Sequence, residues 1–223
     1  MINTSERRLE RMNSGLADTI SAGAYNAILM GLVLYGFIVN AAMVAFLSPV
    51  LYGIDYIPFL IGYFVCVIAG TFCAASDKPA MSFLGYNLIV LPIGVLLCQV
   101  IPAYSSDLVM QAILLTGAIS LVMLVLAAVC PHWFAGIGRT LAISLGVGLV
   151  LSLGSWLLGF SDDFLVWGFA IIFTLYIGYD LGRSQAFPKT LDNAIDSALD
   201  LYLDIINLFL RILRILAKAR SRD

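Results

Sequence analysis

Six long apolar stretches follow one another along the chain and are separated by short polar turns. Each stretch has at least about the 20 residues that a helix needs to cross the hydrocarbon core of a bilayer. The turns contain serine, proline and charged residues and are too short to form anything else. The pattern predicts an all-α integral membrane protein with spans at about residues 24–48, 54–75, 80–101, 107–130, 134–158 and 164–183.

The last segment, residues 191–218, combines apolar residues with polar residues at regular intervals. Because the intervals are three or four residues, a helix gathers the polar side chains into one stripe along its length. The stripe begins with acids and ends with bases, an order that suits the dipole of a helix. Its members are Asp192, Asp196, Asp200, Asp204, Asn207, Arg211, Arg214 and Lys218.

This polar stripe has two interpretations. A seventh span at about residues 196–218 turns the stripe into the bundle, since ionisable groups at hydrocarbon depth normally face protein or a water-filled path. An amphipathic helix at the membrane surface turns it towards water. Insertion is favoured because a surface helix usually carries bases along its whole polar face, whereas this face starts with aspartates. The chain is then one transmembrane domain over residues 1–223, a seven-helix bundle behind an N-terminal tail of residues 1–22.

Charged residues outside the stripe orient the bundle. The turns on the opposite side from the N-terminus contain no lysine or arginine, and they contain acids. The basic residues on the N-terminal side are Arg7, Arg8, Arg11, Lys78, Arg139, Arg183 and Lys189, and the acids on the other side are Asp55, Asp107, Asp162 and Asp163. By the positive-inside rule the N-terminus faces the cytoplasm. A seventh span conflicts with this rule, because it carries the bases from Arg211 to Arg222 to the opposite side.

The amino-acid composition excludes several kinds of binding site. Hydrophobic residues make up 61% of the chain and charged residues 12%, and the formal net charge is −2. Because the charges are few and nearly balanced, the protein is not expected to have a surface that binds nucleic acid. One histidine, His132, and four cysteines do not assemble a typical zinc site. We expect no cofactor, and the lipid bilayer is the expected partner.

Asp180 is the ionisable residue that stands well inside apolar sequence outside the stripe, in LYIGYDLGR. Asp204, in the middle of the stripe, is its natural partner, because two carboxylates close together cannot both ionise cheaply and tend to share a proton. A tight turn at Pro188 offsets the two by about eight residues, roughly 12 Å. The pairing therefore predicts a connection over about residues 184–195 and a helix that begins near Asp196. Alternatively, Asp180 marks the water-exposed end of the sixth span, with Arg183 one turn later.

The segments YD at 179–180 and ALDLYLDIINLFLRIL at 198–213 resemble the Bax inhibitor-1 (transmembrane Bax inhibitor motif) family. The resemblance implies a seven-helix bundle with a central last helix and a pH-dependent calcium leak. It also implies that Asp180 and Asp204 correspond to the paired aspartates of the family's pH sensor. Members often place arginines at the end of the second helix, where one latches onto the sixth-helix aspartate. Here that stretch reads CAASDKP, so Lys78 is the candidate latch cation.

Three functions follow from these observations. The leading hypothesis is a non-enzymatic, pH-sensitive calcium leak channel of a bacterial plasma membrane, monomeric, with transient Ca²⁺ binding at Asp180 and Asp204. The remaining stripe residues, Asp196, Asp200, Asn207, Arg211 and Arg214, are candidates to line the conduit. The first alternative is a non-conducting regulator that binds other membrane proteins in stress or cell-death control. The remote alternative is an intramembrane aspartyl protease, which needs its second aspartate in a GxGD sequence, whereas Asp204 sits in LYLDII.

Overall fold

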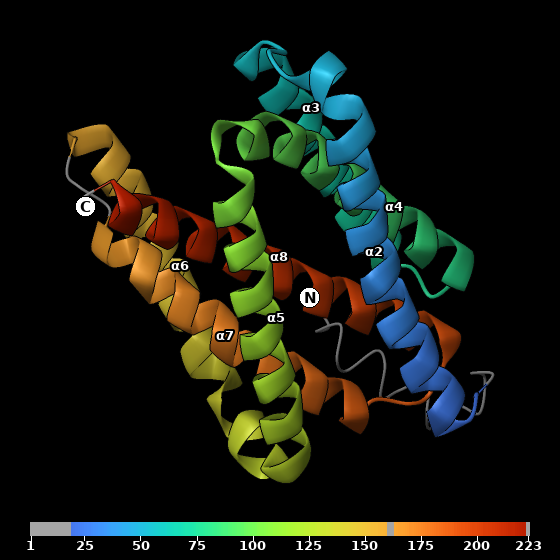
Figure 1. Ribbon diagram of the computed structural model, residues 1–223. Coiled ribbons are helices and arrows are strands. Elements are labelled where there is room, and N and C mark those ends of the chain that lie inside the picture. Colours follow the sequence, from blue (N-terminus) through green and yellow to red (C-terminus); the bar gives the residue numbers. More distant parts are fainter. Residues whose placement is uncertain (1–18, 160–162, 222–223) are drawn as a thin grey trace. The chain divides into compact units, whose positions relative to one another are not determined.

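The computed structural model describes residues 19–159 and 163–221, and within them the chain is almost entirely helical (Figure 1). A short 3₁₀ helix, Ile101–Ala103, follows the third of the described α-helices. The α-helices are α2 (Ala22–Leu51), α3 (Tyr56–Ala74), α4 (Pro79–Val100), α5 (Ser106–Val129), α6 (Pro131–Leu158), α7 (Asp163–Ala186) and α8 (Leu191–Arg220).

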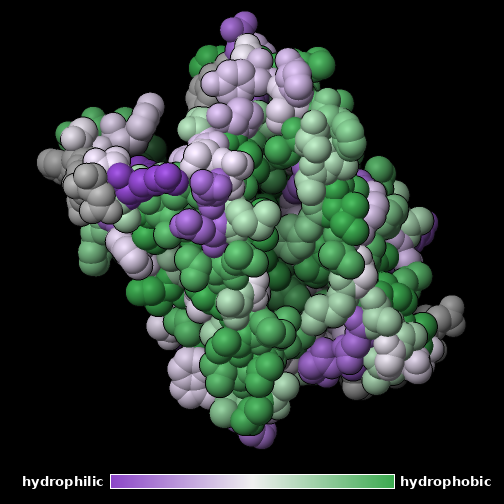
Figure 2. All heavy atoms as spheres, in the orientation of Figure 1, coloured by the Kyte–Doolittle hydropathy of each residue, from purple (hydrophilic) through white to green (hydrophobic). Residues whose placement is uncertain are grey.

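Six of these helices, α2 to α7, are long and apolar enough to cross a membrane, and they fall on the six predicted stretches. Large apolar side chains cover much of the visible surface, as expected for lipid contact (Figure 2). Phe72 of α3 and Trp156 of α6 are each 78% exposed. The prediction of an all-α membrane protein is therefore confirmed. The predicted cytoplasmic bases Arg7, Arg8 and Arg11, and the predicted turn and tail residues Asp162 and Arg222, lie outside the described residues.

Two helix boundaries differ from the sequence analysis. Pro131 and His132, predicted as a turn, form the start of α6, because proline fits the first turn of a helix. The predicted connection over residues 184–195 is wrong, since α7 continues to Ala186 and α8 begins at Leu191. The Thr190 hydroxyl accepts a hydrogen bond from the Asn193 amide at 3.1 Å and caps α8 there.

The chain divides into two compact units. Unit 1 contains α2, α3, α4 and α8 as far as Tyr202, and unit 2 contains α5, α6, α7 and α8 from Leu203 onward. The last helix thus contributes to the core of both units, in agreement with the predicted central position of the C-terminal helix. All four cysteines are free thiols, and Cys98 is buried whereas Cys130 is exposed.

In unit 1, small residues and tyrosine hydroxyls join the helices. A Cβ atom added to Gly85 of α4 would lie 2.5 Å from the backbone nitrogen of Ala74, so α3 and α4 touch at backbone distance. The Tyr86 hydroxyl donates to the carbonyl of Leu32 in α2 at 2.6 Å. The buried Tyr202 of α8 shares a hydrogen bond with Asn40 of α2.

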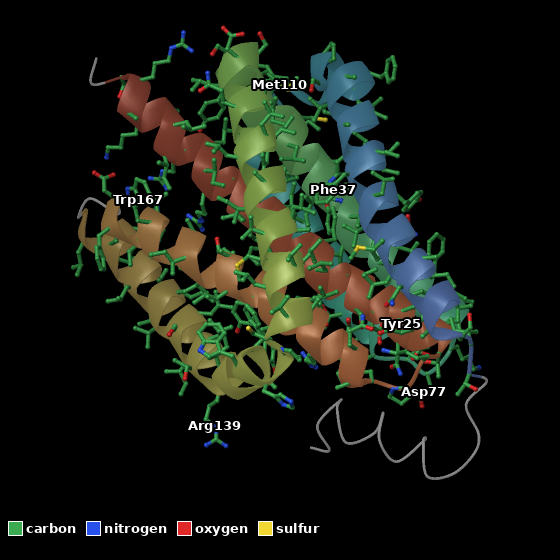
Figure 3. All side chains as sticks on the ribbon, turned by 60° about the horizontal axis from the view of Figure 1, so that its bottom comes forward. Tyr25, Phe37, Asp77, Met110, Arg139 and Trp167 are labelled. Atoms are coloured by element: carbon green, nitrogen blue, oxygen red, sulfur yellow. The ribbon has the colours of Figure 1, made fainter. Side chains whose placement is uncertain are left out.

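The start of α8 is fixed in unit 1 by polar contacts. The Ser82 hydroxyl of α4 donates to the buried carboxylate of Asp192 at 2.6 Å. The hydroxyls of Tyr25 and Ser197 lie 3.0 Å apart, and Figure 3 shows Tyr25 on α2 beside the first turns of α8. A carboxylate in the first helical turn also suits the helix dipole. These contacts hold the acidic end of α8 inside protein instead of leaving it in water.

In unit 2, α6 and α7 pack aromatic rings onto glycines. The ring of Phe134 in α6 lies over Gly178 of α7, and the ring of Tyr179 in α7 lies over Gly138 of α6. Each ring occupies the place that a Cβ atom of the facing residue would fill. The reciprocal contacts set the rotation of α7 immediately before Asp180.

Candidate functional site

Asp180 lies in the last two turns of α7, where its side chain is 10% exposed. The Arg183 guanidinium nitrogen Nη1 is 3.8 Å from its Oδ1 atom, one turn later on the same helix. The alternative interpretation placed Arg183 beside Asp180 and is confirmed in that respect. It also placed Asp180 at a water-exposed helix end, and that part is wrong because the carboxylate is largely covered.

Asp204 is buried, with 7% of its surface exposed, in the part of α8 that belongs to unit 2. The hydroxyl of Tyr176 in α7 interacts electrostatically with both Asp180 and Asp204. Tyr179 and Arg183 act on the same hydroxyl. Both predicted acids are therefore near enough to the Tyr176 hydroxyl to act on it electrostatically.

Three contacts give the register of α8 against α7. The Arg211 guanidinium lies over the Phe169 ring, 4.7 Å from its centroid, and Lys218 forms an ion pair with Asp163. Asp204 interacts electrostatically with Tyr176. Steps of six or seven residues along α7 match steps of seven along α8 in the opposite direction. The three contacts therefore describe one antiparallel register.

This register fixes the axial distance between the two acids. Asp204 lies level with Tyr176, which precedes Asp180 by four residues, and four residues of helix correspond to about 6 Å. A tight turn at Pro188 had predicted roughly twice that offset. With the four-residue connection over 187–190, the two acids are thus about one helical turn apart along the axis, without the longer connection that the sequence analysis required.

The remaining residues of the polar stripe divide between the two units. Asp196 is buried and belongs to unit 1, together with the half-buried Asp200. The Asn207 amide donates to the Leu203 carbonyl of its own helix at 2.7 Å. Arg211 rests on Phe169, and Arg214 is exposed. That these residues line a conduit stays a prediction.

Lys78 is exposed at the N-cap of α4 in unit 1, whereas Asp180 belongs to unit 2. The latch between them stays a prediction. Within the part of the chain that the structure describes, histidine, cysteine and carboxylate side chains form no group of three that is placed to hold a metal ion. That Asp180 and Asp204 bind Ca²⁺ transiently stays a prediction.

The C-terminal end of α8 contacts two other segments of unit 2. Lys218 pairs with Asp163, the first residue of α7, and the Arg220 guanidinium donates to the Ser105 hydroxyl at 3.4 Å. Ser105 and Asp163 belong to the turns predicted to lie opposite the N-terminus. With 30 residues, α8 is about 45 Å long, more than the hydrocarbon thickness. Among the described residues, the helices that are long and apolar enough to cross a membrane are α2 to α7, so a seventh span over α8 stays a prediction.

Sequence reasoning missed the residues that surround the two acids. Tyr176 precedes Asp180 by one helical turn on the same face, and this spacing could have identified it. Phe134 approaches from a different helix, and only its packing against Gly178 reveals its role.

A comparison with protein families places these residues in context. The family model described as "Inhibitor of apoptosis-promoting Bax1" matches residues 18–221, nearly the whole chain. The chain belongs to this Bax inhibitor family. The match includes all seven described α-helices and both acids, and it confirms the resemblance found in the sequence. The chain is thus a multi-pass membrane protein of the Bax inhibitor family.

Proteins from two other organisms share sequence with this chain. An uncharacterised Helicobacter pylori protein is 33% identical over 171 residues, which cover 72% of this chain and 73% of the relative. A protein from a second strain of that species is 38% identical over 132 residues, 57% of this chain and 56% of its own length. Bax inhibitor 1 of Saccharomyces cerevisiae is 35% identical over 133 residues, 53% of this chain and 43% of the yeast protein.

Proposed function

We propose that the protein is a pH-sensitive cation leak channel with calcium as the permeant ion, and that Asp180 and Asp204 form its gate. The observation that carries the proposal is that Asp180 and Asp204 are largely covered carboxylates on two helices, about four residues apart along the axis in the register that the Phe169–Arg211 and Asp163–Lys218 contacts define. Ionisable side chains at membrane depth are costly and are usually functional.

The chemistry of the pair suits a latch. Two carboxylates about one helical turn apart in a covered site tend to share one proton, since both negative charges together repel and neither is well hydrated. Tyr179 and Arg183 of α7 act electrostatically on the Tyr176 hydroxyl together with the two acids. The shared proton holds α7 and α8 together, and gaining or losing a proton weakens that hold. Flux through the protein therefore depends on pH.

Calcium fits the acidic character of α8. Carboxylates are hard oxygen ligands that suit Ca²⁺, and acidic side chains select cations in pores. Asp192, Asp196 and Asp200 lie on the same helix as Asp204 and lead towards its N-terminal end. The ion binds transiently as cargo, and the function requires neither a cofactor nor catalysis.

The contacts at the ends of α8 also support a topology. We place the N-terminus and the 187–190 connection in the cytoplasm, following the bases Lys78, Arg139 and Arg183. The C-terminus lies on the opposite side, where α8 contacts Ser105 and Asp163. A bacterial plasma membrane agrees with the Helicobacter relatives.

A second candidate function is a non-conducting regulator that binds other membrane proteins. The family description favours it, because it names inhibition of another protein. A stoichiometric membrane partner on purification, with no ion flux from the isolated protein, distinguishes this function from the leak. An intramembrane aspartyl protease has less support, since Asp204 lies in LYLDII and not in GxGD.

The experiment that tests the leak is calcium flux into liposomes that contain the purified protein, measured between about pH 6 and 8. Wild type is compared with Asp180→Asn and Asp204→Asn. Asp107→Asn serves as the matched control, because Asp107 is an exposed aspartate in the first turn of α5. We expect a pH-dependent flux in wild type and control that becomes independent of pH in both site variants. No flux above that of empty liposomes would refute the leak and favour the regulator.

A further inference from the structure

The first two turns of α8 are enclosed by protein in unit 1. Residues 192–199 are all buried, and they include the carboxylates of Asp192 and Asp196, which are 5% and 7% exposed. The Ser82 hydroxyl of α4 donates to Asp192 inside this enclosure. An ion that passes along the acidic part of α8 from this end therefore needs part of the enclosure to move.

The segment of residues 19–21, immediately before α2, pairs with the two residues that precede α8. The Ile20 amide donates to the Lys189 carbonyl at 2.7 Å, and Thr19 forms an antiparallel bridge with Thr190. The bridge is isolated from any strand, and the first and last side chains of the segment are exposed. Two paired segments without a third strand are marginally stable in water. This pairing can therefore open while the buried contacts beneath it stay in place.

The contacts beneath the segment place a base beside the start of α8. Tyr25 of α2 is fully buried, and its hydroxyl lies 3.0 Å from that of Ser197 (Figure 3). The Lys189 ammonium lies over the Tyr25 ring, 4.4 Å from its centroid. A fixed positive charge at an entrance opposes the passage of cations. Because Lys189 also accepts the hydrogen bond from Ile20, release of the segment frees the backbone of the residue that carries this charge.

We propose that residues 19–21 form a lid over the start of α8, and that this lid must open for the leak to conduct. The closed lid holds Lys189 over Tyr25 and keeps water and cations away from the buried acids. When the lid opens, the lysine leaves the entrance and the polar start of α8 becomes hydrated. The inference rests on the proposed leak function and on the proposed cytoplasmic N-terminus.

Ile20→Pro tests the lid because it removes the N–H group that donates to Lys189. One backbone hydrogen bond changes an equilibrium constant by about two- to tenfold, so calcium flux into liposomes should rise by that factor if the lid is mostly closed. Ala22→Pro is the matched control. Ala22 is the exposed first residue of α2, a position where proline fits without loss of a helical hydrogen bond, so its flux should equal that of wild type.

A disulfide across the bridge makes the opposite test. Directly opposed residues of an antiparallel pair have Cα atoms about 4.5–5.5 Å apart, a distance that a disulfide spans. Thr19→Cys with Thr190→Cys is made in a Cys130→Ser background, since Cys130 is exposed. Oxidation should abolish calcium flux, and dithiothreitol should restore it. The reduced form of the same protein is the control, because both forms lack the Thr190 hydroxyl that caps α8.

Hydrogen exchange of the peptide with residues 190–199 gives a readout that is independent of flux. It should be faster than in wild type for Ile20→Pro, slower after oxidation of the cysteine pair, and unchanged for Ala22→Pro. Thermal unfolding identifies a variant that fails to fold, and the cross-linked protein carries the test if Ile20→Pro does so.

The outcomes separate the lid from the leak. A conducting wild type whose flux is unaffected by Ile20→Pro or by the cross-link would overturn this inference alone. A wild type without flux would overturn the proposed leak, and exchange rates that are equal in all variants would overturn the lid itself.

Discussion

The packing of Phe134 on Gly178 makes a prediction about the support of the site. A Cβ atom at position 178 would lie 2.7 Å from Cδ1 and Cζ of the Phe134 ring, well inside van der Waals contact. Gly178→Ala therefore forces the ring or α7 to move. Overpacking of this kind costs about 1–3 kcal/mol, and the better helix propensity of alanine returns up to about 1 kcal/mol. Because the added Cβ meets a rigid ring, the cost lies in the upper part of its range, and the expected net loss is about 1–2 kcal/mol.

The matched control is Gly168→Ala in the same helix, where no atom lies within 4 Å of the added Cβ. For a chain of this length, 1 kcal/mol corresponds to about 2–4 °C in Tm, so Gly178→Ala should melt about 2–8 °C below wild type. Circular dichroism of the purified proteins in one detergent measures the melting temperatures. The melting temperature of Gly168→Ala should equal or exceed that of wild type. Equal melting temperatures for the two variants would refute the close packing of α6 on α7 before Asp180.

Three further predictions concern unit 1. Ser82→Ala removes the hydroxyl that donates to the buried Asp192 carboxylate and should lower the free energy of unfolding by about 1–3 kcal/mol. Ser76→Ala should lower it much less, and equal losses in the two variants would contradict the contact. Tyr202→Phe removes the hydroxyl shared with Asn40 and should cost about 0.6–1.7 kcal/mol in thermal unfolding, and a variant as stable as wild type would mean that the bond contributes nothing. Burial lowers the pKa of Lys189 below 10.5, so the folded state loses this proton before the unfolded state does, and stability rises with pH up to that value. The Tm of wild type relative to Lys189→Met should therefore increase between about pH 8 and pH 10.5, and a constant difference would contradict the shift.

Much of the fold was predictable because apolar length alone marks a membrane helix. The six stretches match α2 to α7 to within a few residues. The start of α8 was not predicted, because the cap depends on the Thr190 hydroxyl alone and Asn193 stands where a capping box has Glu or Gln. The sequence analysis therefore placed the helix start at Asp196, more than one turn too late.

The site was predictable in part for a different reason. Asp180 and Asp204 are conspicuous because charged residues are rare in apolar sequence, and the family resemblance paired them. Their axial offset depends on the register of two helices, which the contacts of Phe169 with Arg211 and of Asp163 with Lys218 define. The contact of the Phe134 ring with Gly178 results from tertiary packing between two helices, and no local sequence pattern indicates it.

The central claim is that Asp180 and Asp204 act as one proton-sharing unit, and a double-mutant cycle on calcium flux tests it most directly. The pH dependence of flux in liposomes is measured for wild type, Asp180→Asn, Asp204→Asn and the double variant. If the acids share one proton, each single substitution removes the whole pH response and the second substitution adds nothing further. Two single variants that each retain part of the response, with effects that add in the double variant, would contradict the shared proton and show two independent acids.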